Sequence, residues 1–241
     1  MKNIIKKLFN CFGLHLSKFN AISVPGYQTV QALNANNINV VFDIGANVGQ
    51  FASELREYGY QGKIVSFEPL PQAYKGLLSQ AKGDVNWIIH PRCAIGAAIG
   101  EIEINVAANS ASSSILPMLS AHENSAPHAK YTHKEWSPII TLDSVLDQYI
   151  SPEDNLFIKI DTQGYEWAVL DGAEQAIRQS KGVLLELSLI PLYEGQKLWQ
   201  DLVDRLSSTQ HFIFAIQPGF TDAKTGQTLQ VDGLFFNKEI V

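Results

Sequence analysis

A glycine-rich turn is the segment of this sequence best suited to bind a small ligand. It reads Asp43-Ile-Gly-Ala-Asn-Val-Gly49 and starts inside a short apolar run. Gly45 and Gly49 let the backbone approach a ligand closely, and Asn47 tolerates a left-handed conformation that most residues resist. A helix that begins near Gly49 would direct free N–H groups and its positive dipole end at that ligand. The Asp43 carboxylate would suit a ligand that carries ammonium and sulfonium charges.

Glu68 is a second candidate because it follows another short apolar run, Ile64–Phe67. An acid at the end of the second strand of a nucleotide-binding sheet holds ribose hydroxyls. Glu68 therefore indicates a nucleoside without choosing between NAD and S-adenosylmethionine, and the alternative is a solvated acid in a loop. The turn departs from the dinucleotide pattern G-x-G-x-x-G, since Asn47 and Gln50 replace its second and third glycines.

The elements that must position these residues follow the alternation typical of an α/β fold with a mostly parallel sheet. The expected strands are Val40–Ile44, Ile64–Phe67, Asn86–His90, Leu156–Ile160, Val183–Leu187, Phe212–Ile216 and Gly233–Phe236. The expected helices are one starting near Gly49, then Pro71–Gln80, Leu142–Tyr149, Glu166–Gln179 and Gln196–Leu206. The last two strands are joined without a helix, so we expect them to pair antiparallel.

The middle of the chain departs from this alternation. A tight turn at Gly96–Gly100 predicts a β-hairpin between Cys93–Ile95 and Ile102–Val106. The serine- and histidine-rich stretch Ala107–Ser137 shows no period, so we expect a long loop that covers the site as a lid. Its Tyr131 and Trp136 could stack on a sugar ring.

The composition fits one catalytic domain, residues 40–241, with an N-terminal helical appendage, residues 1–39. The chain has 241 residues, 46% of them hydrophobic, and a formal net charge of −6, which argues against a nucleic-acid partner. Cys11 and Cys93 are too few for a disulfide framework or a zinc site and suit the reducing cytoplasm. Ile5, Leu8 and Phe12 share a helical face. We expect that face to pack on the domain, with a membrane-surface helix as the less favoured alternative.

Several short motifs resemble the FkbM methyltransferase family. The longest is Phe157-Ile-Lys-Ile-Asp-Thr-Gln-Gly-Tyr-Glu166, in which Gln163 stands where the family usually has glutamate. The others fall in family order: Asp43–Gly49, Phe67–Pro69, Ala94–Gly96, Ser112–Ser114, Thr141–Asp143 and Asp232–Phe235.

The resemblance implies a Rossmann-like class I methyltransferase fold, with strand order 3-2-1-4-5-7-6 and an antiparallel last strand. It implies S-adenosyl-L-methionine as cofactor. The residues implied to bind it are Asp43, Gly45, Ala46, Asn47 and Gly49 around the methionine part, Glu68 and Pro69 at the ribose, Cys93, Ala94 and Ile95 at the adenine, and Asp161 at the methyl group.

Three residues are candidates for catalysis on the acceptor side. For a hydroxyl acceptor the protein must position the hydroxyl and remove its proton, and Asp161 is the first choice for base or anchor. Glu166 is the second, against the alternative that it stabilises the first turn of its helix. Lys159 either keeps Asp161 ionised by pairing with it or extends from the strand to solvent. Glu186 is a pocket acid or part of a strand-end ion pair. We expect no metal, and His122, His128 and His133 are expected to be surface loop residues.

The predicted function is therefore methylation by S-adenosylmethionine, of a hydroxyl on a sugar, polysaccharide precursor or secondary metabolite by the family resemblance. The alternatives are an NAD-dependent oxidoreductase and a non-catalytic nucleoside-binding protein on the same fold.

Overall fold

A seven-stranded sheet forms the centre of the computed structural model, which describes residues 2–14, 16 and 18–238. The strand order is β3-β2-β1-β7-β8-β10-β9. The strands are β1 (Val40–Ile44), β2 (Lys63–Phe67), β3 (Trp87–Ile89), β7 (Leu156–Ile160), β8 (Gly182–Ser188), β9 (His211–Pro218) and β10 (Gln230–Asn237). Strand β10 pairs antiparallel with both β8 and β9, and the other neighbours pair in parallel. This arrangement confirms the expected order and the antiparallel last strand.

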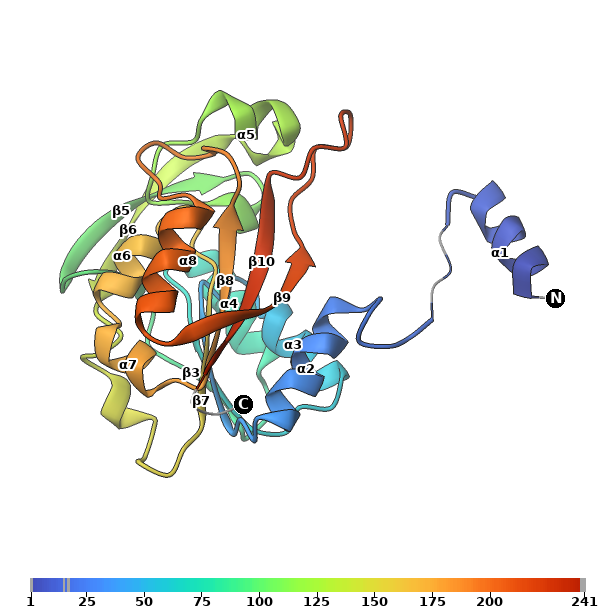
Figure 1. The fold of residues 1–241 in the computed structure, drawn as a ribbon. Helices are drawn as coiled ribbons and strands as arrows, with labels where there is room; N and C mark the ends of the chain where they lie inside the picture. The colour runs from blue at the N-terminus through green and yellow to red at the C-terminus, as the bar shows by residue number, and fades with distance from the viewer. Residues whose placement is uncertain (1, 15, 17, 239–241) are drawn as a thin grey trace.

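Helices cover both faces of this sheet, which explains why its central strands are mostly apolar. Helices α2 (Pro25–Ala35), α3 (Gln50–Glu57) and α4 (Pro71–Gln80) pack on one face, and α6 (Glu166–Asp171), α7 (Glu174–Gln179) and α8 (Trp199–Ser208) on the other (Figure 1). Every residue of β1 and β7 is buried. Along β1, Val40, Phe42 and Ile44 enter one core and Val41 enters the other, as the two-residue period of a strand requires.

The register of the parallel strands brings the predicted acids to one edge of the sheet. Ile44 at the end of β1 lies opposite Phe67 of β2 and Ile160 of β7. Glu68 and Asp161 each follow one residue later, so both leave the sheet beside the glycine turn. Ligands of open α/β sheets bind at this carboxyl edge.

A smaller sheet, in the order β4-β6-β5, corrects two expectations (Figure 1). Strand β4 (Ala94–Ile95) pairs in parallel with β6 (Tyr131–Ile140), and β5 (Gly100–Ala107) pairs antiparallel with β6. The predicted hairpin between Cys93–Ile95 and Ile102–Val106 is therefore wrong, because β6 lies between its two arms.

The predicted loop Ala107–Ser137 is wrong in its last part, where β6 begins at Tyr131. Most residues of β6 up to Trp136 are at least partly exposed, so the strand carries polar side chains and lacks an apolar signal. The rest of the stretch holds three short helical segments. These are η1 (Ser110–Ser112), α5 (Ser120–Ser125) and η2 (Pro127–Ala129).

Two predicted helices also differ from the structure. Leu142–Tyr149 contains only the short 3₁₀ turn η3 (Leu146–Gln148), and the Asp143 carboxylate accepts hydrogen bonds from the Gln175 and Ala176 N–H groups at the start of α7. The predicted helix Glu166–Gln179 is divided into α6 and α7 at Gly172. A Cβ at Gly172 would lie 1.9 Å from the Gly96 carbonyl oxygen, so the chain approaches β4 at a point where only glycine fits.

The structure places only part of the expected appendage 1–39 on the domain. Helix α2 packs on it through Val30 and Leu33, which are fully buried. Helix α1 (Lys2–Cys11) stands clear of the domain (Figure 1), and the Phe12 side chain is 75% exposed. The side chains of Ile5 and Leu8, predicted to share its face, lie outside the described residues. None of the described helices is long and apolar enough to cross a membrane.

Removal of residues 1–18 should therefore leave the domain intact. We expect Tm to change by less than about 2 °C, because helix α1 stands clear of the domain and so contributes little to the free energy of unfolding. Differential scanning calorimetry of the full chain and the truncated chain measures this. A further truncation to residue 36 removes Val30 and Leu33 and should abolish cooperative unfolding. A large loss of Tm on the first truncation would show that α1 packs on the domain.

Candidate functional site

A cavity of about 720 Å³ opens at the carboxyl edge of β1, β2 and β7. It contains most of the residues that the sequence predicts for the cofactor. They are Gly45, Ala46, Asn47, Glu68, Pro69, Cys93, Ala94, Ile95 and Asp161, and Lys159 lines the same cavity.

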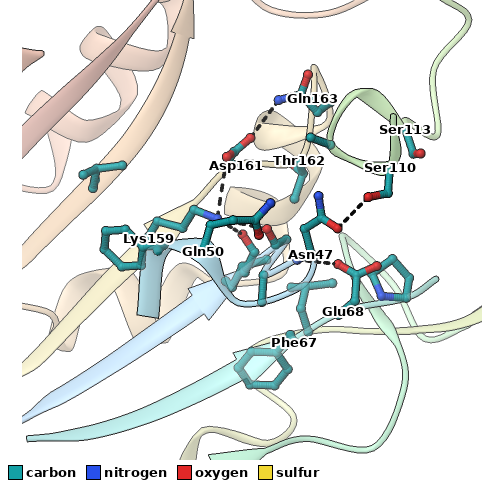
Figure 2. A pocket seen from close by; sticks show the side chains of 18 of the residues that line it. Asn47, Gln50, Phe67, Glu68, Ser110, Ser113, Lys159, Asp161, Thr162 and Gln163 are labelled. Carbon is teal, nitrogen blue, oxygen red and sulfur yellow. Dashed lines mark hydrogen bonds and ion pairs between the residues drawn. The ribbon is translucent and has the colours of Figure 1, made fainter. Parts of the chain in front are cut away.

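The glycine turn has the left-handed geometry that its residues predict. Gly45, Asn47 and Gly49 have φ values of +74°, +48° and +92°. A Cβ at Gly45 would lie 1.9 Å from the Asp161 carbonyl oxygen, so the turn after β1 rests directly on the end of β7. The Asn47 N–H donates to Glu68 Oε2 at 2.8 Å, and Ser110 Oγ donates to Asn47 Oδ1 at 2.9 Å (Figure 2). The turn therefore joins three separate segments around the cavity.

Glu68 is fixed at the cavity wall by backbone donors. Its Oε1 accepts the Leu70 N–H at 2.8 Å, while Oε2 accepts that of Asn47. Burial raises the pKa of the Glu68 carboxyl to about 7, although both N–H bonds act in the opposite direction. Each carboxylate oxygen retains capacity for another hydrogen bond, which is what recognition of a vicinal diol needs.

Lys159 joins the two strand ends beneath the cavity. Its Nζ lies 3.1 Å from Asp43 Oδ1 and 2.9 Å from the Gly45 carbonyl oxygen. It also lies 3.6 Å from Asp161 Oδ2 (Figure 2). Burial by itself lowers the pKa of Lys159, but the Asp43 carboxylate, followed by that of Asp161, raises it overall above the ordinary value. Of the two predicted geometries, the structure has Lys159 paired with acids and 5% exposed.

Asp43 does not line the cavity, although the sequence predicts it as a cofactor contact. The side chain is fully buried, and its Oδ2 accepts a hydrogen bond from Ser66 Oγ at 3.2 Å. Asp43 therefore acts on the site through Lys159. Gly49 is also absent from the lining, and a Cβ there would lie 2.9 Å from the Trp87 ring. Its small size serves packing against β3.

Glu166, the second candidate base, also lies outside the lining. Its Oε1 accepts hydrogen bonds from the N–H groups of Thr162 at 2.9 Å and Gly164 at 3.1 Å, so it fixes the turn that follows β7. Burial raises the pKa of the Glu166 carboxyl to about 7. This geometry matches a residue that stabilises the local backbone.

Gln163 links two acids next to this turn. Its Nε2 donates to Asp161 Oδ1 at 2.8 Å and to Glu186 Oε1 at 3.0 Å, and its Oε1 accepts from Tyr193 Oη at 2.8 Å. Burial, together with the charge of Asp161, raises the pKa of Glu186 well above its usual range. The amide supplies two donors to carboxylates, which a glutamate at this position could not do, because even a protonated carboxyl has one donor.

The expected lid lies only partly over the cavity. Residues Ser110, Ala111, Ser113, Ser114 and Ile115 line it, whereas Tyr131 and Trp136 do not. The expectation that His122 lies at the surface is wrong. It is 3% exposed and packs between the rings of Tyr193 and Phe220, each 5.2 Å away. His128 and His133 are exposed as expected. Across the described ranges no group of three or more His, Cys, Asp or Glu residues is arranged to hold a metal ion.

The sequence analysis assigned no role to the residues on the far side of the cavity. Helix α2 contributes Gly26 and Thr29, α3 contributes Glu54, and the pair β9–β10 contributes Gln217 and Asp232. Asp232 was visible as part of the motif Asp232–Phe235 and as an acid in an otherwise apolar run. The others carried no local signal, since their place depends on the packing of distant elements.

Replacement of Lys159 by methionine should be strongly destabilising, because it leaves the buried Asp43 carboxylate without its cation. We expect a loss of about 3–5 kcal/mol in the free energy of unfolding at pH 8. Urea unfolding at pH 8 measures it. Lys134→Met breaks the exposed pair with Glu103 and should cost little, and equal losses in both variants would contradict this account.

Comparison with known proteins adds a family assignment to this geometry. Residues 43–214 match the family model described as the methyltransferase FkbM domain. No curated protein sequence matches the chain.

Among solved structures, a putative O-methyltransferase from Klebsiella pneumoniae has a TM-score of 0.48 at 10% identity, covering 98% of this chain and 89% of its own. Precorrin-6y C5,15-methyltransferase from Geobacter metallireducens GS-15 has a TM-score of 0.46 at 14% identity, covering 92% of both chains. Fibrillarin from Aeropyrum pernix, solved with natively bound S-adenosyl-L-methionine, has a TM-score of 0.46 at 10% identity, covering 87% of this chain and 75% of its own. Similarity at this level assigns no function.

The family match is of a different kind, because it extends from the glycine turn at Asp43 into β9 and so spans more than half of the 241 residues. It includes Glu68, Lys159, Asp161 and Gln163, which surround the cavity. The chain therefore belongs to the FkbM methyltransferase domain family.

Proposed function

We propose that the cavity binds S-adenosyl-L-methionine and that the chain transfers its methyl group to a hydroxyl of a small, uncharged or cationic acceptor. The observation that supports this most directly is the charge of the cavity wall. Five carboxylates line the cavity: Glu54, Glu57, Glu68, Asp161 and Asp232. Among the described lining residues Lys159 is the one basic side chain, and it is already paired with Asp43.

Such a wall favours a ligand with positive charge, which S-adenosylmethionine carries on its sulfonium and ammonium groups. An NAD-type cofactor brings a pyrophosphate instead, and that group needs positive charge or several free N–H donors. The acid-lined cavity therefore supports the methyl donor over the dinucleotide, and no feature of the site favours the oxidoreductase alternative.

The shape and chemistry of the wall also fit the parts of the donor. Glu68 presents a fixed carboxylate to a ribose diol, and Cys93, Ile95 and Leu70 offer a buried apolar surface to an adenine. Helix α3 begins at Gln50, another lining residue, so its N-terminal end faces the cavity and suits a carboxylate.

When bound, the sulfonium supplies an electrophilic methyl group with a neutral thioether as leaving group. The residues of this chain then have to orient the acceptor, exclude water and take up one proton. A sugar, polysaccharide precursor or secondary metabolite with free hydroxyls fits these needs. Phosphorylated acceptors do not, because the five carboxylates would repel them.

A thermal-shift experiment tests the cofactor. Saturating S-adenosylhomocysteine should raise Tm by several degrees, since a ligand at about 100 times its Kd adds about 2.7 kcal/mol of stability. NAD and NADP should leave Tm unchanged. Glu68→Ala should weaken binding by about 1–3 kcal/mol, measured by titration calorimetry, because it removes charged acceptors of hydrogen bonds.

Glu101→Ala, an exposed position on β5, is the control and should keep full affinity. A rise in Tm with NAD and none with S-adenosylhomocysteine would identify a dinucleotide protein. Tight S-adenosylhomocysteine binding without transfer to any acceptor would favour the non-catalytic alternative.

A further inference from the structure

The cavity extends well beyond the residues that suit a nucleoside. Its nucleoside part is formed by the turn after β1, the end of β2, β4 and the segment 110–115. A second part is walled by α2, α3, the end of β9 and the start of β10. Lys159 and Asp161 link the two parts, because both contact Gly45 of the first part and their charges act on Asp232 of the second. If the donor occupies the first part, the second is the space left for an acceptor.

Asp161 stands at this junction, but both of its carboxylate oxygens already have partners. Oδ1 accepts the Gln163 amide at 2.8 Å, and Oδ2 faces Lys159 Nζ at 3.6 Å. A carboxylate that is held by a cation and an amide is well placed to fix a neighbouring group. Its two oxygens are therefore committed to Gln163 and Lys159 and suit an anchoring role.

Asp232 lines the second part, and its carboxylate is free. Among residues 2–14, 16 and 18–238, no group donates a hydrogen bond to it and no cation lies within ion-pair distance. Strand β10 places Asp232 opposite Glu186 of β8 and opposite Gln217 of β9. The charged groups that act on it are Lys159 from β7, Asp161 directly after β7 and Glu54 from α3.

The surroundings of Asp232 also set its affinity for a proton. Burial, then the negative charges of Asp161 and Glu54, raise the pKa of Asp232 to about 7, while Lys159 acts in the opposite direction. A base is most effective when its pKa lies close to the working pH, and a carboxyl with the ordinary value would accept a proton poorly.

Helix α2 keeps Glu54 in the wall beside Asp232. A Cβ at Gly26 would lie 2.2 Å from Glu54 Cδ, so the Glu54 side chain lies directly on the α2 backbone. Burial and the neighbouring Glu57 raise the pKa of Glu54 as well. Helix α2 thus shapes this part of the cavity through Gly26, which leaves room for the Glu54 side chain.

We propose that the acceptor binds between α2, α3 and β10, that Asp232 is the general base that removes its hydroxyl proton, and that Asp161 anchors the reacting groups. This inference rests on the proposed function and assigns the acceptor side of the same cavity. In the step, the acceptor O–H bond breaks and its proton passes to Asp232 Oδ. The oxygen forms a bond to the methyl carbon as the carbon–sulfur bond breaks, and that electron pair remains on sulfur.

A calorimetric experiment tests Asp232 without an acceptor. Binding of S-adenosylmethionine and of S-adenosylhomocysteine is measured at pH 7 in two buffers of different ionisation enthalpy, which counts the protons released. The sulfonium should expel the proton from Asp232, so the methyl donor should release up to about half a proton more than its neutral product. Asp232→Asn should remove that difference and keep its affinity for S-adenosylhomocysteine within about threefold. An unchanged difference would overturn the proposal.

Turnover tests the base directly, with radiolabelled methyl donor and two neutral probes, methyl β-D-glucopyranoside and methyl α-L-rhamnopyranoside. The wild-type rate should fall as pH drops through about 7, because the base must be ionised. Asp232→Asn should lower kcat by about 10²–10⁴-fold and lose this pH dependence, and Asp232→Glu should recover part of the rate. Asp204→Asn, on the exposed side of α8, is the matched control and should keep the wild-type rate and profile.

The outcomes separate this inference from the proposed function. An Asp232→Asn variant with wild-type kcat and pH profile overturns the base assignment while methyl transfer stands. Wild-type protein that binds S-adenosylhomocysteine yet methylates neither probe contradicts the proposed acceptor class, and the proton count then decides the role of Asp232 alone.

Discussion

The ion pair between Lys159 and Asp43 connects the parts of the molecule on which the site depends. Both side chains lie in the middle of the sheet, on neighbouring parallel strands, where neither could remain charged alone. Because the two charges pair, β1 and β7 can carry polar groups near their carboxyl ends while the rest of each strand stays in the apolar core. The same ammonium also contacts the carbonyl oxygen of Gly45 and the carboxylate of Asp161, so one cation fixes the turn and the acid that border the cavity.

Around this cation the protein gathers more carboxylates than it neutralises. Burial raises the pKa values of Glu68, Glu166, Glu186 and Asp232, so each holds its proton to a higher pH than a carboxyl in water. These groups differ in their hydrogen-bond donors. Backbone N–H groups donate to Glu68 and Glu166, and the Gln163 amide donates to Glu186, whereas Asp232 faces the cavity. This difference distinguishes groups that hold the structure from a group available to react.

Elements that are buried on both faces could be predicted from the sequence. Prediction failed where one face of an element meets solvent, and where a side chain that caps a neighbouring helix lies in a segment expected to be helical. Strands β1 and β7 read as apolar runs with one charged residue each, and their predicted limits agree with the structure. Strand β6 was missed because its outward side chains are polar, and the helix expected at Leu142–Tyr149 was lost to the capping of α7 by Asp143. Glu68 and Asp161 were found because a strand end fixes their position. The inward place of Asp43 and the approach of Glu54 and Asp232 depend on packing between distant segments, which no local pattern records.

The amide of Gln163 gives the hydrogen-bond network a fixed direction. Tyr193 donates to Gln163, and Gln163 donates to Asp161 and Glu186, so every bond in this chain points from the interior toward the carboxylates. With glutamate at the same position the direction would change with each proton gained or lost. An amide cannot titrate, so the two donors of Gln163 remain available to Asp161 and Glu186 whatever the pH. The residue at position 163 thus fixes the direction of the hydrogen bonds beside the cavity and takes no part in proton exchange itself.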